Sequence, residues 1–175
     1  DFPAAKSLYG DVADVYGADA PYTFLPTFLE AAQRSRNRQA FDAELADARR
    51  LPDPGRRFDV LMTAARCLRA GGAPAAGDAL LDELEKAADT DARKLGILQM
   101  RVPSLPRYFE YGLPPKDIYR KWKAAIVPVI ALQEKLNARA PGSLPSAAQY
   151  ARYAGEAFTF GDYAFADDLL KKYFA

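Results

Sequence analysis

The chain has 175 residues, half of them hydrophobic, so it can bury a sizeable core and is not a disordered chain. Its 24 Lys and Arg against 23 Asp and Glu leave a net charge of +1, which gives no electrostatic case for binding nucleic acid or an anionic membrane surface. There is no His and only one Cys, Cys67, which excludes Ser-His and Cys-His catalytic pairs, a thiolate metal site and an internal disulfide. No apolar run approaches the roughly 20 residues that a membrane-spanning helix needs. We therefore predict a protein without enzyme activity, cofactor, metal ion or transmembrane segment.

Apolar residues recur at helical spacing in the first part of the chain, and turn signals separate the runs. Asn37 and the pair Gly71-Gly72 end helices, while Asp53-Pro54 places a helix cap before a proline at the first helical position. Pro26 falls in the second turn of its helix, so that helix is expected to begin at Pro21 or nearer Leu25. The expected helices cover residues 3–16, 21–36, 38–51, 54–70, 74–88 and 91–98.

The second part of the chain opens with an irregular segment, residues 101–115, whose four prolines exclude a regular long helix. The longest helix is expected to follow, from Pro114-Pro115 to about Ala138, with a kink at the interior Pro128. A turn near residue 142 then leads into a last helical hairpin. These runs amount to nine or ten helices, and the alternation typical of strands is absent, so the chain is predicted to be all-α.

The last hairpin matches one in the middle of the chain. Gly161, which ends one helix and precedes the expected cap Asp162, aligns with Gly72, and Leu169-Leu170 aligns with Leu80-Leu81. Asn37 takes the same turn position about 35 residues before Gly72, a spacing close to the 34-residue period of tetratricopeptide repeats. Residues 57–88 and 146–174 are the best repeat-like units, and residues 22–50 are a degenerate third.

On these residues, about half of the chain resembles tetratricopeptide repeats. The resemblance implies antiparallel helical hairpins stacked into one domain over residues 1–175, with a groove that holds a peptide or another protein. The chain departs from the family pattern in three ways. The two best units lie 89 residues apart, residues 90–140 do not fit, and Gly77 stands where the second helix of a repeat should have Ala. An irregular helical bundle is the alternative architecture.

Aromatic residues are the one compositional excess, with 10 Tyr, 10 Phe and 1 Trp. Their ordinary role is core packing, because aromatic side chains bury large areas. However, Tyr150 and Tyr153 lie on adjacent faces of one helix, so some of these rings are expected to line a cavity, and Tyr supplies a polar group there as well. The candidate ligand-binding residues are Tyr108, Phe109, Tyr111, Tyr119, Trp122, Tyr150, Tyr153 and Phe158.

Three other groups are interpreted as structural. The neighbouring carboxylates Glu83 and Glu85 flank Leu84 and point in different directions on a helix, as do Asp167 and Asp168, so we expect them on solvated faces. Cys67 lies among apolar residues of a helix and is expected to be buried. The basic residues around Trp122 could meet an anionic partner or lipid headgroups, but a solvated face with long side chains over the core is favoured.

Two functions follow from these expectations. The first is a non-enzymatic carrier that holds an apolar ligand of the lipid or sterol class in an aromatic-lined helical cavity. The alternative is a tetratricopeptide-like adaptor for a protein partner. A closed apolar pocket would favour the carrier, and an open groove lined with Lys, Arg and Asn would favour the adaptor.

The expected location is the periplasm or the cell envelope. The chain begins at Asp1 without a Met, and a single Cys is compatible with an exported bacterial protein. A trimmed cytoplasmic domain would have the same features and is the alternative.

Overall fold

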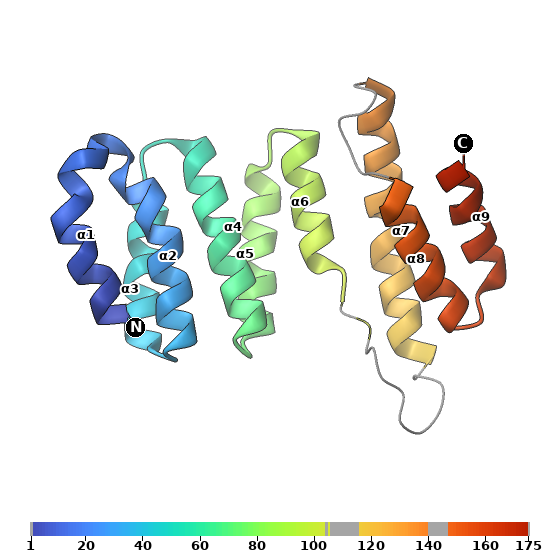
Figure 1. Ribbon diagram of the computed structural model, residues 1–175, viewed down its shortest axis with the longest axis horizontal. Coiled ribbons are helices and arrows are strands. Elements are labelled where there is room, and N and C mark those ends of the chain that lie inside the picture. The colour runs from blue at the N-terminus through green and yellow to red at the C-terminus, as the bar shows by residue number, and fades with distance from the viewer. Residues whose placement is uncertain (1, 104, 106–115, 140–146, 175) are drawn as a thin grey trace. The chain divides into compact units, whose positions relative to one another are not determined.

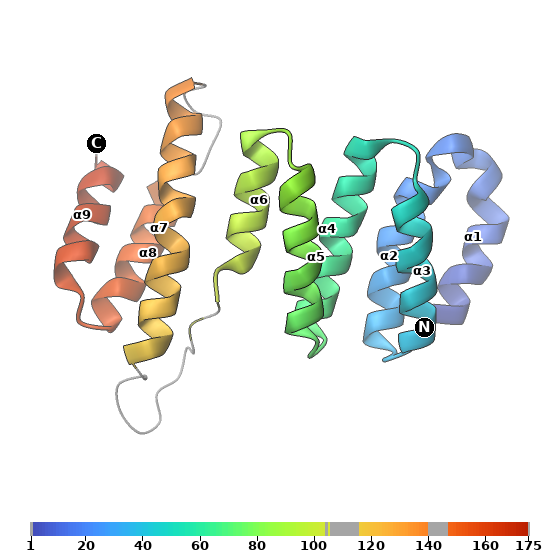
Figure 2. The same cartoon turned by 180° about the vertical axis from the view of Figure 1, so that it is seen from behind.

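A computed structural model describes residues 2–103, 105, 116–139 and 147–174. These residues form nine α-helices and one short 3-10 helix, and they contain no strand, so the prediction of an all-α protein with about nine or ten helices is confirmed (Figures 1 and 2). The chain divides into two compact units, Asp1–Ala88 and Asp89–Ala175, and each is described by itself. The expectation of one domain over the whole chain stays a prediction. Most of the proline-rich segment at 101–115 lies outside the described residues.

The first unit is two layers of antiparallel helices. Helices α2 (Ala20–Arg34) and α4 (Pro54–Ala70) pack against each other and face the viewer in Figure 1, whereas α3 (Arg38–Arg50) and α5 (Pro74–Ala87) face the viewer in Figure 2. Helix α1 (Phe2–Tyr16) packs on α2 and is joined to it by the 3-10 helix Gly17–Asp19. Each helix has an apolar stripe along one side. A single helix cannot shield this stripe from water, so the stripe is buried against the neighbouring helices. The fully or nearly fully buried side chains of the two layers include Phe28, Leu29, Ala32, Phe41, Ala48, Ala64, Ala65, Leu68, Leu80 and Leu81.

Local sequence signals set most helix ends. The Asp53 carboxylate accepts hydrogen bonds from the backbone N–H groups of Gly55 and Arg56, at 2.8 and 3.0 Å, and so caps α4. Helix α2 begins at Ala20, not near Leu25 as one reading of Pro26 suggested, and it continues through that proline. Leu25, which precedes Pro26, is buried. The free energy gained by burying the apolar side of α2, which includes Leu25, offsets the backbone hydrogen bond that Pro26 cannot donate.

The same hydrogen-bonded turn closes three hairpins. In each, the last helical turn ends at a residue with positive φ: Arg36 (φ 54), Gly72 (φ 86) and Gly161 (φ 77). The N–H group of the residue that follows donates to a carbonyl five positions back, which is the Schellman arrangement. These bonds are Asn37 to Ala32 at 2.9 Å, Ala73 to Leu68 at 3.0 Å and Asp162 to Ala157 at 3.0 Å.

Gly77 has a packing reason for departing from the repeat pattern. A Cβ atom at this position would lie 2.5 Å from Cγ of Arg69 and 3.0 Å from the carbonyl oxygen of Ala65, both on the facing helix α4. Even the methyl group of Ala would therefore crowd the helix pair. The glycine allows the backbones of α4 and α5 to approach closely.

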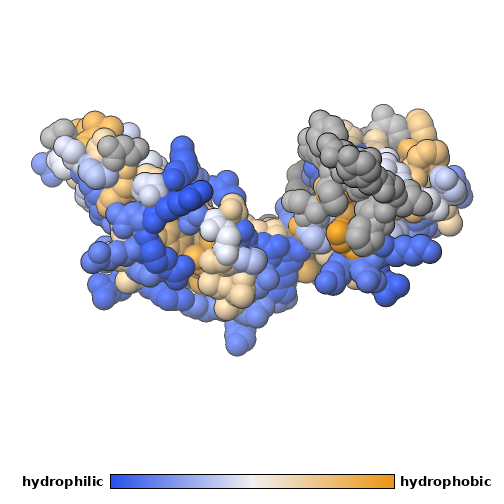
Figure 3. Space-filling view, turned by 90° about the horizontal axis from the view of Figure 1, so that it is seen from below, coloured by the Kyte–Doolittle hydropathy of each residue, from blue (hydrophilic) through white to orange (hydrophobic). Residues whose placement is uncertain are grey.

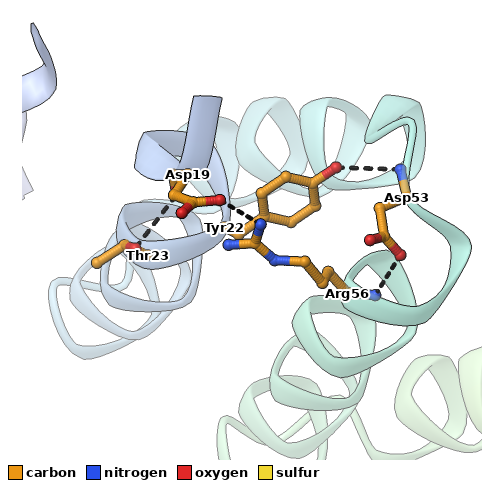
Figure 4. A network of polar contacts seen from close by, with 5 residues as sticks. All are labelled: Asp19, Tyr22, Thr23, Asp53 and Arg56. Carbon is orange, nitrogen blue, oxygen red and sulfur yellow. Dashed lines mark hydrogen bonds and ion pairs between the residues drawn. The ribbon is translucent and has the colours of Figure 1, made fainter. Parts of the chain in front are cut away.

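A polar network joins the beginnings of α2 and α4 (Figure 4). The Arg56 guanidinium lies 3.8 Å from the centre of the Tyr22 ring and forms an ion pair with Asp19. The Tyr22 hydroxyl accepts a hydrogen bond from the backbone N–H of Asp53 at 3.0 Å. Asp19, chiefly through its hydrogen bond, raises the pKa of Arg56. The network holds the two helices together at the end opposite to their hairpin turns (Figure 1).

The second unit contains α6 (Asp91–Arg101), α7 (Lys116–Arg139), α8 (Ala147–Thr159) and α9 (Tyr163–Phe174). Thr90 caps α6 through a hydrogen bond from the N–H of Arg93 at 3.2 Å. Leu169 is buried on α9, but Leu170, which was expected on the same apolar face, is 39% exposed. Consecutive residues on a helix are about 100° apart, and on α9 only Leu169 belongs to the buried cluster, whereas Leu80 and Leu81 are both buried on α5. The buried cluster comprises Leu95, Trp122, Ile126, Val129, Ile130, Tyr150, Tyr153, Ala154, Ala157, Ala166 and Leu169.

Candidate functional site

The aromatic residues proposed as ligand contacts divide into core and surface. Trp122, Tyr150 and Tyr153 are at most 8% exposed and belong to the buried cluster of the second unit. Phe158, in contrast, is 63% exposed, with its ring edge against the Tyr163 ring. Tyr108, Phe109 and Tyr111 lie outside the described residues. A ligand-binding role for these eight residues stays a prediction.

Tyr119 lies at the edge of the same cluster and joins α7 to the turn before α9. Its ring stacks on Trp122 and Phe160, with centroids 5.6 and 4.9 Å away. Its hydroxyl donates to Oδ2 of Asp162 at 2.7 Å, and Nζ of Lys123 donates to the same oxygen at 2.6 Å. Lys123 and then Tyr119 lower the pKa of Asp162, while burial and this carboxylate raise the pKa of Tyr119. The Tyr119 hydroxyl and the Lys123 ammonium both find an acceptor within the protein, which indicates a structural junction.

Tyr150 and Tyr153 were expected to diverge because they lie on adjacent faces of α8. The structure buries both, since the cluster that covers α8 receives side chains from α7 on one side and from α9 on the other. None of the five proposed residues that the structure describes, namely Tyr119, Trp122, Tyr150, Tyr153 and Phe158, lines any of the three pockets described next.

The largest of these pockets lies at the two hairpin turns of the first unit and has a volume of about 520 Å³. Its floor is apolar and its rim is polar. In Figure 3, which views the end of the molecule that carries these turns, hydrophilic residues dominate this unit and hydrophobic surface is visible between them. We call it the turn pocket; it is lined by Ala32, Gln33, Arg34, Arg36, Asn37, Arg38, Phe41, Leu68, Ala70, Gly71 and Ala73.

The turn pocket carries three arginines and no acidic lining residue. Arg34 and Arg38 form ion pairs along their own helices, with Glu30 and Asp42, both at 3.0 Å. Such exposed pairs are weak and exchange readily with other anions. Arg36 forms no ion pair with any other described residue. The pocket therefore presents guanidinium groups to solvent over an apolar floor, which suits a carboxylate or another oxyanion.

Backbone conformation shapes the turn pocket. Arg36 holds a left-handed φ of 54° at the position where the other two hairpins have Gly72 and Gly161. The amide of Gln33 lies directly over Gly71, because a Cβ at Gly71 would be only 1.6 Å from Nε2 of Gln33. The sequence signal for this pocket is the alternation Arg34-Ser35-Arg36-Asn37-Arg38 across an expected turn. It was not recognised, because the chain as a whole is almost neutral.

A second pocket, of about 320 Å³, lies between α1, α2 and α3 and is mostly aromatic and apolar. It also contains Glu44, which is only 3% exposed. Glu44 lies three residues after Phe41 and four before Ala48, so it shares their buried face. We call it the aromatic pocket; it is lined by Lys6, Tyr9, Pro21, Phe24, Leu25, Phe28, Glu44, Asp47, Arg50, Leu51 and Pro52.

A third pocket, of about 440 Å³, lies between α7 and α9 in the second unit. Its apolar lining includes Val127, Ile130 and Phe165, and charged residues such as Glu134 and Lys172 surround it. Glu134 and Lys172 form an ion pair with each other across the two helices. The charges of these two rim residues therefore compensate each other.

The described residues contain no group of His, Cys, Asp or Glu able to hold a metal ion. None of the described helices is long and apolar enough to cross a membrane, as the sequence predicted. Cys67 is buried, and burial raises the pKa of its thiol. Of the neighbouring carboxylates, Glu83 pairs with Arg49 and Asp167 with Lys171 on exposed faces.

Comparison with known proteins gave no match: no family model, no curated protein and no solved structure is similar to the chain. The resemblance to tetratricopeptide repeats therefore stays a proposal. The function has to be argued from the pockets and their chemistry.

Proposed function

We propose that the protein is a non-enzymatic, tetratricopeptide-like adaptor that binds an acidic segment of a partner protein at the turn pocket. The Arg side chains around an apolar floor support this proposal, since an open groove with Arg and Asn was the feature expected of an adaptor. Helices α2 and α4 begin at Ala20 and Pro54, 34 positions apart, which is the period of the family.

The observation that carries the proposal is the conformation of Arg36. A left-handed backbone costs a non-glycine residue roughly 1–2 kcal/mol. Glycine would avoid that cost, as it does at Gly72 and Gly161. An arginine without an ion pair among the described residues, held in this conformation beside a pocket, is consistent with strain retained for binding.

The test is calorimetric titration of the full chain with a short Asp- and Glu-rich peptide and with its Asn- and Gln-containing counterpart. The acidic peptide should bind, and Arg36→Gln should weaken it about tenfold, or about 1.4 kcal/mol. Arg120→Gln is the control, because Arg120 is also exposed, lies on α7 away from the turn pocket, and its loss changes the net charge by the same amount. Equal affinity for the two peptides, or equal losses for the two variants, would contradict the proposal.

A carrier for an apolar ligand is the second candidate, and the aromatic pocket favours it. Its rings from Tyr9, Phe24 and Phe28 form an apolar lining of the kind that holds small molecules. Its volume is at the small end for a drug-sized ligand, so it would hold part of a lipid or sterol. Organic extraction of the purified protein followed by mass spectrometry tests this function. Absence of any co-purified lipid, together with no binding in titration, would rule it out.

A further inference from the structure

Glu44 is a buried carboxylate with one oxygen unpaired. Its Oε1 atom forms an ion pair with Nζ of Lys6 at 2.7 Å, and its side chain is only 4% exposed. Its Oε2 atom is buried and accepts no hydrogen bond from any described residue. A buried charged oxygen without a donor is unfavourable, and such groups are rare unless a ligand or a function accounts for them. Glu44 lines the aromatic pocket, so a donor in the pocket could reach this carboxylate once the Lys6 ammonium moved away from it.

The pocket already holds an ammonium group in an aromatic setting. Nζ of Lys6 lies 4.5 Å from the centre of the Phe28 ring and 6.0 Å from that of Phe2. The Tyr9 ring stands edge-on to Phe24 and Phe28, with centroids 5.1 and 5.4 Å away. Ring faces next to a carboxylate are the arrangement that attracts organic cations. Lys6 is 40% exposed, so its ammonium can move into solvent and make room.

The remaining charges of the pocket do not satisfy the free oxygen. Asp47 and Arg50 also line it, and they form an ion pair with each other at 3.5 Å. The four charged lining residues therefore balance, with Lys6 on Glu44 and Arg50 on Asp47. Among the atoms of these four residues, Oε2 of Glu44 is a buried oxygen that accepts no hydrogen bond from a described residue.

We propose that the aromatic pocket binds a primary alkylammonium group. An N–H of the ammonium donates to Oε2 of Glu44, and the aliphatic stem packs against Phe24 and Tyr9. Lys6 is the internal competitor for the same carboxylate. The source of the group is a free amine or the lysine side chain of a peptide. The inference does not rest on the acidic-peptide function, since it concerns a different pocket.

The experiment uses the full chain and three probes: hexylamine, hexanol as its neutral isostere, and an N-acetyl-lysine amide as the peptide-like source. Binding is measured by calorimetry and by the shift in the unfolding temperature. Hexylamine or the lysine amide should bind at least tenfold more tightly than hexanol, and the better of the two identifies the source. Equal binding of hexylamine and hexanol, or binding of neither amine, would overturn the proposal.

Variants separate the charge from the packing. Glu44→Gln should reduce amine affinity at least tenfold, whereas Glu83→Gln, an exposed carboxylate paired with Arg49, should leave it unchanged. If Glu44→Gln fails to fold, the unfolding temperature of Lys6→Met provides a second test of the proposal. This variant leaves Glu44 without its partner, so its unfolding temperature should fall, and hexylamine but not hexanol should restore it. Failure of the amine to restore Lys6→Met more than wild type would overturn the inference.

Discussion

The hydroxyl of Tyr119 donates to Oδ2 of Asp162 across 2.7 Å, and this bond joins the longest helix to the turn that begins the last one. Removal of the hydroxyl in Tyr119→Phe leaves the rings stacked on Trp122 and Phe160 but deletes the bond. We expect a loss of about 1 kcal/mol in the free energy of unfolding, measured by urea denaturation. An unchanged stability would show that solvent replaces the bond at no cost.

The same bond should be visible in an alkaline titration. Because burial and Asp162 raise the pKa of Tyr119 above the ordinary value of 10.0, its contribution to stability is complete below that pH and is lost as the pH rises further. Of the ten tyrosines, Tyr119 should not ionise in the folded protein near pH 10, as followed by ultraviolet absorbance. Tyr119→Phe should therefore leave the folded-state signal at that pH unchanged. A smaller signal would mean that the hydroxyl ionises normally.

Asp162 should make the protein sensitive to acid. Lys123 and Tyr119 lower its pKa below the ordinary 3.8, so its contribution is present above that value and is lost as the pH falls through the lowered pKa. Asp162→Asn keeps a good helix cap but removes the ion pair, and we expect a loss of about 0.2–1 kcal/mol near neutral pH. The difference in the free energy of unfolding between Asp162→Asn and wild type should become smaller when unfolding is measured below about pH 4. A constant difference would show that the charge has no role.

Substitutions at Arg36 and Gly72, which both have positive φ, should change the free energy of unfolding in opposite directions. Gly72→Ala has open space for its methyl group but forces a left-handed residue, so it should cost about 1 kcal/mol. Arg36→Gly relieves the same strain and should stabilise by about 0.5–1 kcal/mol. If the turn pocket binds acidic peptides, the second variant gains stability and loses affinity together. A loss of stability in Arg36→Gly would show that its side chain contributes to the fold.

Truncation of an aromatic side chain to Ala should reduce the free energy of unfolding strongly where the side chain is buried and little where it is exposed. Trp122→Ala opens a cavity in the second unit and should cost about 3–5 kcal/mol. Phe158→Ala changes an exposed side chain and should stay within about 0.5 kcal/mol of wild type. Chemical denaturation of both variants measures this difference. Similar losses would mean that the exposed ring is covered in solution.

Features that depend on neighbouring residues were predictable from the sequence. The caps at Asp53 and Asp162 and the helix end at Gly72 are formed by residues within a few positions of each other, and all three predictions are confirmed. For the start of α2, one of the two predicted positions, near Leu25, was wrong. There, packing of the stripe around Leu25 outweighed the effect of Pro26.

Features that depend on distant residues were not predictable. The burial of Glu44 requires Lys6 from another helix, and no local pattern reveals that partner. The turn pocket forms where two turns about 35 residues apart in the sequence lie next to each other. Its three arginines therefore line a pocket only once the unit has folded. Leu170 shows the limit of counting apolar residues, because it is 39% exposed although the aligned pair Leu80-Leu81 is buried at both positions.

The recurring turn after α2, α4 and α8 has a consequence for how the chain folds. Each turn is closed by backbone hydrogen bonds within six residues and brings together two helices that follow one another along the chain. Contacts of this kind require only short loops to close, so they cost little chain entropy before they form. We therefore expect the hairpins to nucleate independently and to refold within milliseconds.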